Sequence, residues 1–118
     1  MTSIFRGANP DFTVNELLYQ LQETKASVMI VHPESSDTAL PAAHAYGISP
    51  QRIILFDGKS PSTHAPNHRT VEDLVKQGLS TDDPTFAERK LKPGEARTKL
   101  AFLSFSSGTT GKPKVCLL

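Results

Sequence analysis

The sequence is short of cysteine and of long apolar runs, and each shortage excludes a class of protein. One cysteine, Cys116, cannot form an internal disulfide bond, and a single thiol suits a reducing compartment. No apolar run approaches the ~20 residues that a membrane-spanning helix needs. The first residues also lack the apolar segment of a secretory signal peptide. We therefore expect an intracellular protein without a membrane span.

Net charge is also small, but it is unevenly distributed. The 118 residues carry a formal charge of +1, so the whole chain shows no bias toward nucleic acid or membrane. From Phe86 to Lys114, however, seven residues are basic and two are acidic, out of totals of 13 and 12. A basic stretch beside a loop of Gly, Ser and Thr suits a polyanion such as a nucleotide phosphate. A solvated, lysine-rich surface loop is the alternative that composition alone favours.

Helix signals occur in three places. A capping pair, Thr13 and Glu16, followed by apolar residues at helical spacing, predicts a helix over Val14–Lys25. The alanine-rich stretch Ala39–Tyr46 is expected to be helical, with its proline in the first turn and a glycine just past its end. A short helix is predicted over Thr70–Gln77, with Thr70 and Asp73 as its capping pair, Val71, Leu74 and Val75 on its buried side and Gly78 as its stop.

Three short apolar runs predict strands, at Ser27–Val31, Arg52–Phe56 and Leu100–Phe105. They do not alternate with polar residues, which is typical of strands buried on both faces. Phenylalanines 12, 56, 102 and 105 are assigned to the core. Helices alternating with strands at this spacing predict an α/β fold, a partial parallel sheet with flanking helices. The polar stretches 59–69 and 79–98 are assigned mainly to loops and connections.

The third predicted strand leads directly into a loop with the chemistry of a phosphate site. Two glycines allow the backbone to turn tightly and approach a ligand, and successive N–H groups in such a turn accept anionic oxygens. Hydroxyl and lysine side chains add donors and positive charge, so the segment suits a triphosphate. The residues are Ser106, Ser107, Gly108, Thr109, Thr110, Gly111, Lys112, Pro113 and Lys114.

This loop is not the P-loop of GTPases. That motif needs four residues between its glycines and a Ser or Thr after its lysine. Here Gly108 and Gly111 are closer together, and Pro113 follows Lys112.

The segment Phe105–Lys114 resembles the signature loop of the adenylate-forming, AMP-binding superfamily, which includes acyl-CoA synthetases, 4-coumarate–CoA ligases and luciferases. Residues 7–17, with Asn9-Pro10, Thr13 and Glu16-Leu17, are similar to the family's entry into its N-terminal domain. The run Lys90–Glu95 resembles the 4-coumarate–CoA ligase-like branch. The resemblance covers nearly the whole chain, but the chain covers only part of the family's length.

The resemblance implies an ATP-dependent ligase that converts a carboxylic acid to acyl-AMP and then to acyl-CoA, with Mg²⁺ and CoA. It implies a cytoplasmic or peroxisomal location, and no nucleic-acid partner is expected. If the matching residues have the same roles as in the family, the β- and γ-phosphates would be contacted by Ser106, Ser107, Gly108, Thr109, Thr110 and Gly111, and Lys114 would add positive charge. Lys112 occupies a variable position of the pattern.

The family's later motifs have no counterpart here, so residues 1–118 are expected to be a partial N-terminal domain without the C-terminal domain. We expect no catalytic residue in this chain and no activity of the chain alone. The ending Val115-Cys116 departs from the family's Gly or Ala. A common intron donor read in frame would encode Val-Cys, so we expect a truncated gene model or a read-through transcript. A true short strand that is cut for an unrelated reason is the alternative. A small non-catalytic module that binds a nucleotide or another polyanion remains the alternative function.

A metal site is not expected from the histidines. His64 and His68 have the spacing of helical metal ligands, but Pro66 lies between them in a proline-rich loop. Zinc would also need further ligands.

Overall fold

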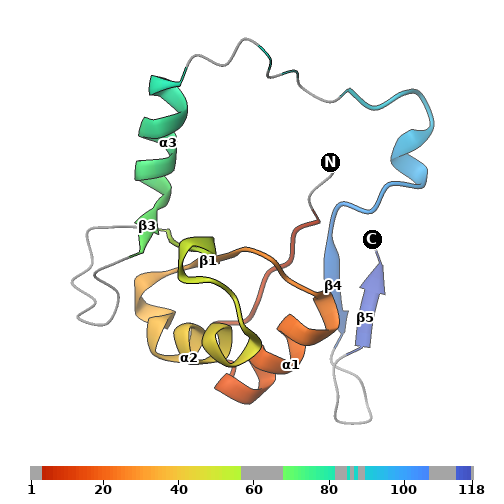
Figure 1. Cartoon of the computed structure of the whole chain (residues 1–118). Coiled ribbons are helices and arrows are strands. Elements are labelled where there is room, and N and C mark those ends of the chain that lie inside the picture. The colour runs from red at the N-terminus through yellow and green to blue at the C-terminus, as the bar shows by residue number, and fades with distance from the viewer. Residues whose placement is uncertain are drawn as a thin grey trace. The chain divides into compact units, whose positions relative to one another are not determined.

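The computed structural model describes residues 4–56, 68–81, 85, 87, 90–106 and 114–117. The chain divides into two compact units. One, called the core unit below, is Asn9–Asp83; the other, called the terminal unit, combines Met1–Ala8 with Pro84–Leu118. Their helices and strands are labelled in Figure 1. Within the described residues, no helix is both long and apolar enough to cross a membrane.

Helix α1 spans Val14–Thr24 and begins as its sequence predicts. The hydroxyl of Thr13 accepts the N–H of Glu16 at 3.4 Å, and the Glu16 carboxylate accepts the N–H of Thr13 at 2.8 Å. This reciprocal pair satisfies two donors that the first turn leaves free. Lys25 ends the helix in the left-handed conformation, with φ of 50°. The predicted helix is confirmed, with its end one residue earlier.

Helix α2 spans Ser36–Tyr46 and starts before the predicted Ala39. A 3₁₀ turn, Pro33–Ser35, leads directly into it, because Pro33 supplies a fixed φ at the first position. Pro41 therefore lies inside the helix and not in its first turn, which corrects the prediction. Gly47 closes the helix at φ of 91°, a conformation that favours glycine, as expected.

The core unit contains a three-stranded parallel sheet in the order β1-β2-β3. Strand β1 is Met29–Val31, β2 is Ile53–Leu55 and β3 is Arg69–Thr70. The α/β prediction of a partial parallel sheet is confirmed. Its third strand is nevertheless β3, in a segment that the sequence assigned to a loop and a helix cap.

One face of this sheet holds the core. Val31, Ile53 and Leu55 are buried there, together with residues of α1 and α2 such as Leu21 and Ala43. The prediction of burial on both faces is wrong for the other side, where Val28, Ile30 and Phe56 are 52%, 55% and 64% exposed. The reason is that both packed helices lie against the first face, and side chains of a strand alternate between faces. Phe12 packs against the core as predicted, whereas Phe56 does not.

Helix α3 spans Val71–Ser80 and follows β3 without a loop. Its predicted capping pair is confirmed, since the Thr70 N–H donates to the Asp73 carboxylate at 2.9 Å. The helix continues past Gly78, which does not stop it. None of its residues is buried, so the predicted buried side is wrong. On its apolar side, Val71 and Leu74 are half-buried, whereas Val75 and Leu79 are exposed.

The terminal unit has an antiparallel hairpin, β4 (Leu103–Ser106) with β5 (Lys114–Leu117). The predicted strand Leu100–Phe105 thus begins three residues later and pairs with β5 and not with the parallel sheet. Phe102, expected in the core, is 59% exposed. Its ring lies 6.3 Å from that of Phe5, and the two residues form an isolated parallel bridge.

Candidate functional site

The hairpin of the terminal unit brings together the two ends of the segment that the sequence singles out. Ser106 and Lys114 are direct partners across the β4–β5 ladder, followed by Phe105 with Val115. Paired backbones in a ladder lie about 5 Å apart, so residues 107–113 connect two points that are held close. The two ends of the segment Ser106–Lys114 are therefore held close together.

Five of the predicted phosphate ligands lie outside the described residues: Ser107, Gly108, Thr109, Thr110 and Gly111. The structure describes the backbone pairing of the other two, Ser106 and Lys114. It pairs the backbones of these two residues across the hairpin. The phosphate-binding role itself rests on the chemistry of the residue types.

Strand β4 is held at its start by the N-terminal segment. The Phe5 N–H donates to the carbonyl of Ala101 at 2.9 Å, and the Leu103 N–H donates to the carbonyl of Phe5 at 3.0 Å. Arg6 follows, and partial burial lowers the pKa of its guanidinium. An arginine remains protonated at neutral pH in any case, so Arg6 adds a positive charge to this unit. Sequence reasoning missed this anchor, which joins residues about a hundred positions apart.

A tight turn precedes β4 and carries several exposed cations. Gly94 adopts φ of 88° before the 3₁₀ turn Glu95–Arg97. The Glu95 carboxylate accepts the Lys92 N–H at 2.9 Å, which closes the turn. Exposed basic side chains flank it, and they give the unit a positive surface: Lys90, Lys92, Arg97 and Lys99.

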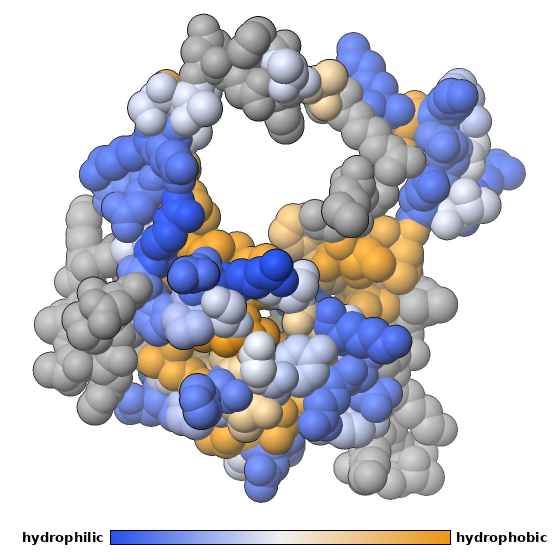
Figure 2. Space-filling view, viewed as in Figure 1, coloured by the Kyte–Doolittle hydropathy of each residue, from blue (hydrophilic) through white to orange (hydrophobic). Residues whose placement is uncertain are grey.

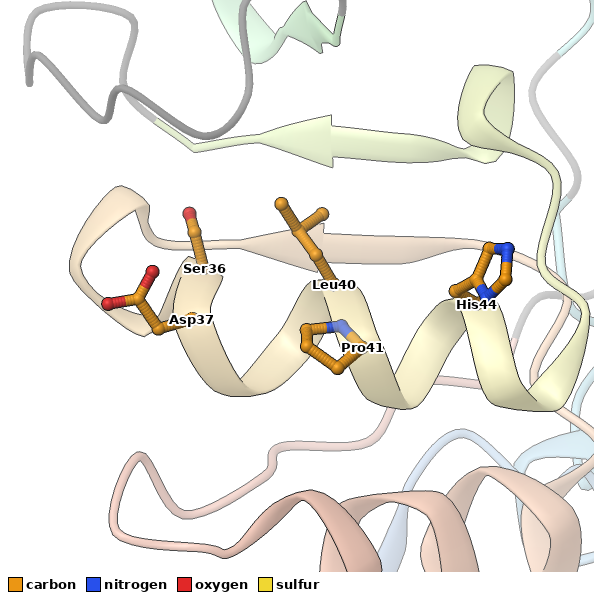
Figure 3. Close-up of a pocket in the computed structure, with 5 residues that line it drawn as sticks. All are labelled: Ser36, Asp37, Leu40, Pro41 and His44. Atoms are coloured by element: carbon orange, nitrogen blue, oxygen red, sulfur yellow. The ribbon is translucent and has the colours of Figure 1, made fainter.

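The core unit has two shallow pockets that sequence reasoning did not predict. The larger, about 410 Å³, follows one side of α2 (Figure 3), with Ser36 and Asp37 near one end of the helix and His44 near the other. The Ser36 hydroxyl is buried without a hydrogen-bond partner among the described residues. The smaller, about 340 Å³, is lined by residues around Lys25 and Arg52.

The histidine pair of the proline-rich loop is only partly described. The structure places His68, whose Nδ1 lies 3.1 Å from the carbonyl oxygen of Pro50, and His64 lies outside the described residues. The contact that the structure describes for His68 is thus with backbone. No group of three His, Cys, Asp or Glu side chains able to hold a metal occurs in the part of the chain that the structure describes.

Similarity to known proteins covers nearly the whole chain. The family model described as AMP-binding enzyme matches residues 3–118. An acyl-CoA ligase, azaF, of Aspergillus niger is 36% identical over 114 residues, which is 94% of this chain and 20% of that protein. A phenylacetyl-CoA ligase, epaB, of the same species is 35% identical with the same coverage. The chain thus spans about one fifth of the length of the curated relatives that it matches.

A solved structure shares the fold. The anthranilate CoA ligase AuaEII, crystallised with anthranoyl-AMP, superposes on this chain with a TM-score of 0.71 at 25% identity. The superposition covers 97% of this chain and 20% of that protein. The separate parallel sheet and hairpin described above are thus consistent with part of a larger α/β protein.

Proposed function

The chain belongs to the AMP-binding enzyme family, and from that membership we propose that its segment Ser106–Lys114 holds the β- and γ-phosphates of ATP. The observation that carries the proposal is the pairing of Ser106 with Lys114 at the base of a Gly/Ser/Thr loop. Successive backbone N–H groups in a glycine-containing turn can bind anionic oxygens, and the pairing holds the two ends of the segment close together, as such a turn needs. The Lys114 charge then complements the phosphates.

The reaction to which this loop would contribute is the formation of an acyl adenylate. A carboxylate oxygen of the acid bonds to the α-phosphorus of ATP, the bond from that phosphorus to the bridging oxygen breaks, and pyrophosphate leaves. The thiol of CoA then attacks the acyl carbon, and AMP leaves. A loop that holds the β- and γ-phosphates acts on the leaving group of the first step. The substrate would be a carboxylic acid, as the names of the relatives suggest.

We further propose that these 118 residues correspond to part of the large N-terminal domain of such a ligase and do not form acyl-AMP by themselves. Adenylation requires the acid to be aligned on the α-phosphorus and charge to be placed on the transition state. The residues of this chain would bind only the β- and γ-phosphates. Binding that is equally strong in the ground and transition states lowers KM without accelerating the chemical step.

The first test is triphosphate binding by the purified chain. ATP, tripolyphosphate and AMP are titrated with Mg²⁺ against wild type and Lys114→Ala. We expect ATP and tripolyphosphate to bind, AMP to bind much more weakly, and Lys114→Ala to weaken ATP binding by about tenfold, the loss expected for one charge-assisted contact. Lys99→Ala is the matched control, since Lys99 is exposed and lies outside the loop. Equal affinity for AMP and ATP would contradict a site for the outer phosphates.

The second test is acid-dependent pyrophosphate exchange with a panel of aryl and fatty acids. We expect no exchange above the level of Lys114→Ala. Clear acid-dependent exchange by wild type alone would show that the chain contains more of the active site than we propose.

The alternative function is a non-catalytic module that binds polyanions through the exposed cations of the terminal unit. The surface lysines Lys90, Lys92 and Lys99 favour it. Such binding would be strongly salt-dependent, and the loss of any one of these cations would weaken it about as much as the loss of Lys114. If Lys92→Ala and Lys99→Ala weaken binding as much as Lys114→Ala, the module is the better description.

A further inference from the structure

The start of strand β4 has a backbone partner besides β5. The Phe5 N–H donates to the carbonyl of Ala101 at 2.9 Å, and the Phe5 carbonyl accepts the Leu103 N–H at 3.0 Å. These two bonds form the parallel bridge between Phe5 and Phe102. Figure 1 shows the N-terminal segment passing beside β4. The start of β4 therefore lies between Phe5 on one edge and β5 on the other.

The β4–β5 hairpin depends on this third segment, because two paired strands by themselves are marginally stable in water. Among the residues of the terminal unit whose burial the structure describes, none is buried. The rings of Phe5 and Phe102 lie 6.3 Å apart, within the range of aromatic pairs. Figure 2 shows apolar surface where the N-terminal segment and the start of β4 lie in Figure 1. Phe5 thus adds two backbone hydrogen bonds and a ring contact to a strand that has little burial to stabilise it.

The bond to Phe5 also determines which way the backbone groups of β4 face. Along a strand, the N–H groups of successive residues point to opposite edges. Because the Leu103 N–H points to Phe5, the backbone groups of Ser104 and Ser106 point to β5. Ser106 and Lys114 therefore occupy a hydrogen-bonded position of the antiparallel ladder, directly at the base of the loop. Phe5 thus selects the edge of β4 on which the loop closes.

We propose that Phe5 is a positioning residue for the phosphates of ATP, an inference that rests on the proposed function of Ser106–Lys114. Phe5 holds the start of β4, β4 pairs with β5, and this ladder keeps Lys114 opposite Ser106 at the base of the loop. A binding segment whose ends are held before the ligand arrives loses less conformational freedom on binding. Without the bridge, the Lys114 charge is no longer placed beside the loop, and its contribution to phosphate binding falls.

Phe5→Pro tests the proposal in the full chain, because proline has no N–H to donate to Ala101. Amide hydrogen exchange should become faster in β4 and β5 and stay unchanged in the core unit. Titration with ATP and Mg²⁺ should give a Kd about tenfold higher than that of wild type. Ile4→Pro is the matched control, since no described residue accepts a hydrogen bond from the Ile4 N–H. Phe5→Leu keeps both backbone bonds and should bind ATP nearly as tightly as wild type.

A double-mutant cycle with Lys114→Ala separates positioning from a general loss of folded protein. Lys114→Ala should weaken ATP binding less in the Phe5→Pro background than in wild type, because the lysine is no longer held at the loop. If Phe5→Pro only reduced the fraction of folded chains, Lys114→Ala would change the Kd by the same factor in both backgrounds.

Several outcomes would overturn the positioning role. Unchanged hydrogen exchange of β4 and β5 in Phe5→Pro would show that Phe5 does not hold the hairpin. Unchanged ATP affinity in that variant, or an equal loss in Ile4→Pro, would show that the bridge does not control the loop. Both results leave the proposed function intact, because wild type still binds ATP in them. A wild-type chain that does not bind ATP would instead overturn the proposed function, and this role of Phe5 with it.

Discussion

The two units of the chain differ in how their residues are buried. Among the described residues of the core unit, nine apolar side chains form a buried cluster around Leu21, Ala42 and Ile53. In the terminal unit, none of the residues whose burial the structure describes is buried. Yet the terminal unit carries the proposed phosphate loop and most of the basic residues of the chain. Burial of apolar side chains therefore stabilises the core unit. The terminal unit is instead held by backbone hydrogen bonds between its strands and exposes polar side chains.

The strongest test of this contrast removes apolar volume from each unit. Leu21→Ala in the core should lower the free energy of unfolding by about 2–4 kcal/mol, since it leaves a cavity beside α2 and the sheet. Leu91→Ala in the terminal unit should change it by less than about 0.5 kcal/mol. Urea unfolding followed by circular dichroism, at matched protein concentration, measures both. Similar losses for the two variants would remove the distinction between the units.

Two glycines of the core unit should respond to alanine with opposite signs. Gly47 ends α2 at φ of 91°, where a Cβ is strained, so Gly47→Ala should destabilise the protein by about 1 kcal/mol. Gly78 lies inside α3 with open space around it, and Gly78→Ala should stabilise that helix by up to about 1 kcal/mol. Thermal unfolding reports the first and helical circular dichroism the second. The same sign for both would contradict the helix ends described here.

Removing the capping threonine from α1 and from α3 compares a helix that packs in the core with one that buries no residue. Thr13→Ala weakens α1, which packs in the core, and should lower the free energy of global unfolding by about 1 kcal/mol. Thr70→Ala weakens α3, which buries no residue, so its effect should be confined to α3. Amide hydrogen exchange separates the two cases. Equal loss of protection throughout the core unit in both variants would show that α3 is part of the cooperative core.

The smallest expected effect is the pH dependence of helix stability that comes from the capping carboxylates Glu16 and Asp73. Hydrogen bonds from the Thr13 backbone and then its side chain lower the pKa of Glu16 below its usual 4.5. Those from Thr70 lower the pKa of Asp73 below its usual 3.8. A lowered carboxyl pKa stabilises the folded state above the unfolded pKa, and the contribution is lost as pH falls through the folded pKa.

Helicity should therefore decline below about pH 4.5, and Glu16→Gln with Asp73→Asn should flatten that decline. Circular dichroism between neutral pH and pH 2 is the measurement. An unchanged acid profile in the double variant would indicate that other carboxylates control the transition.

Prediction from sequence succeeded where the controlling interactions are local. Both capping boxes link residues three apart, and the end of α2 depends on a single glycine, so each was visible in a few residues. It failed where partners are distant. The strand Arg69–Thr70 is too short for a periodic pattern and exists because Ile54 and Leu55 provide its register. The exposure of Ile30 and Val75 could not be predicted, because exposure depends on which other segments pack against a surface.

The candidate site divides in the same way. The residue types of Ser106–Lys114 indicate phosphate chemistry without any structure, since glycine, hydroxyl and lysine donors are properties of the residues. That Ser106 faces Lys114 follows only from the antiparallel ladder, and that Phe5 holds the start of β4 follows only from the folded chain.

Residue types and short spacings are enough to identify the family, the α/β class and the capped helices, and they indicate phosphate chemistry for the loop. The folded chain was needed to see that the strand before the loop joins a hairpin, and that one sheet face and the apolar side of α3 are exposed. Strand pairing and burial are properties of pairs of segments. A sequence pattern describes one segment at a time, whereas the exposed fraction of Ile30 or Leu79 depends on every segment that does or does not reach it.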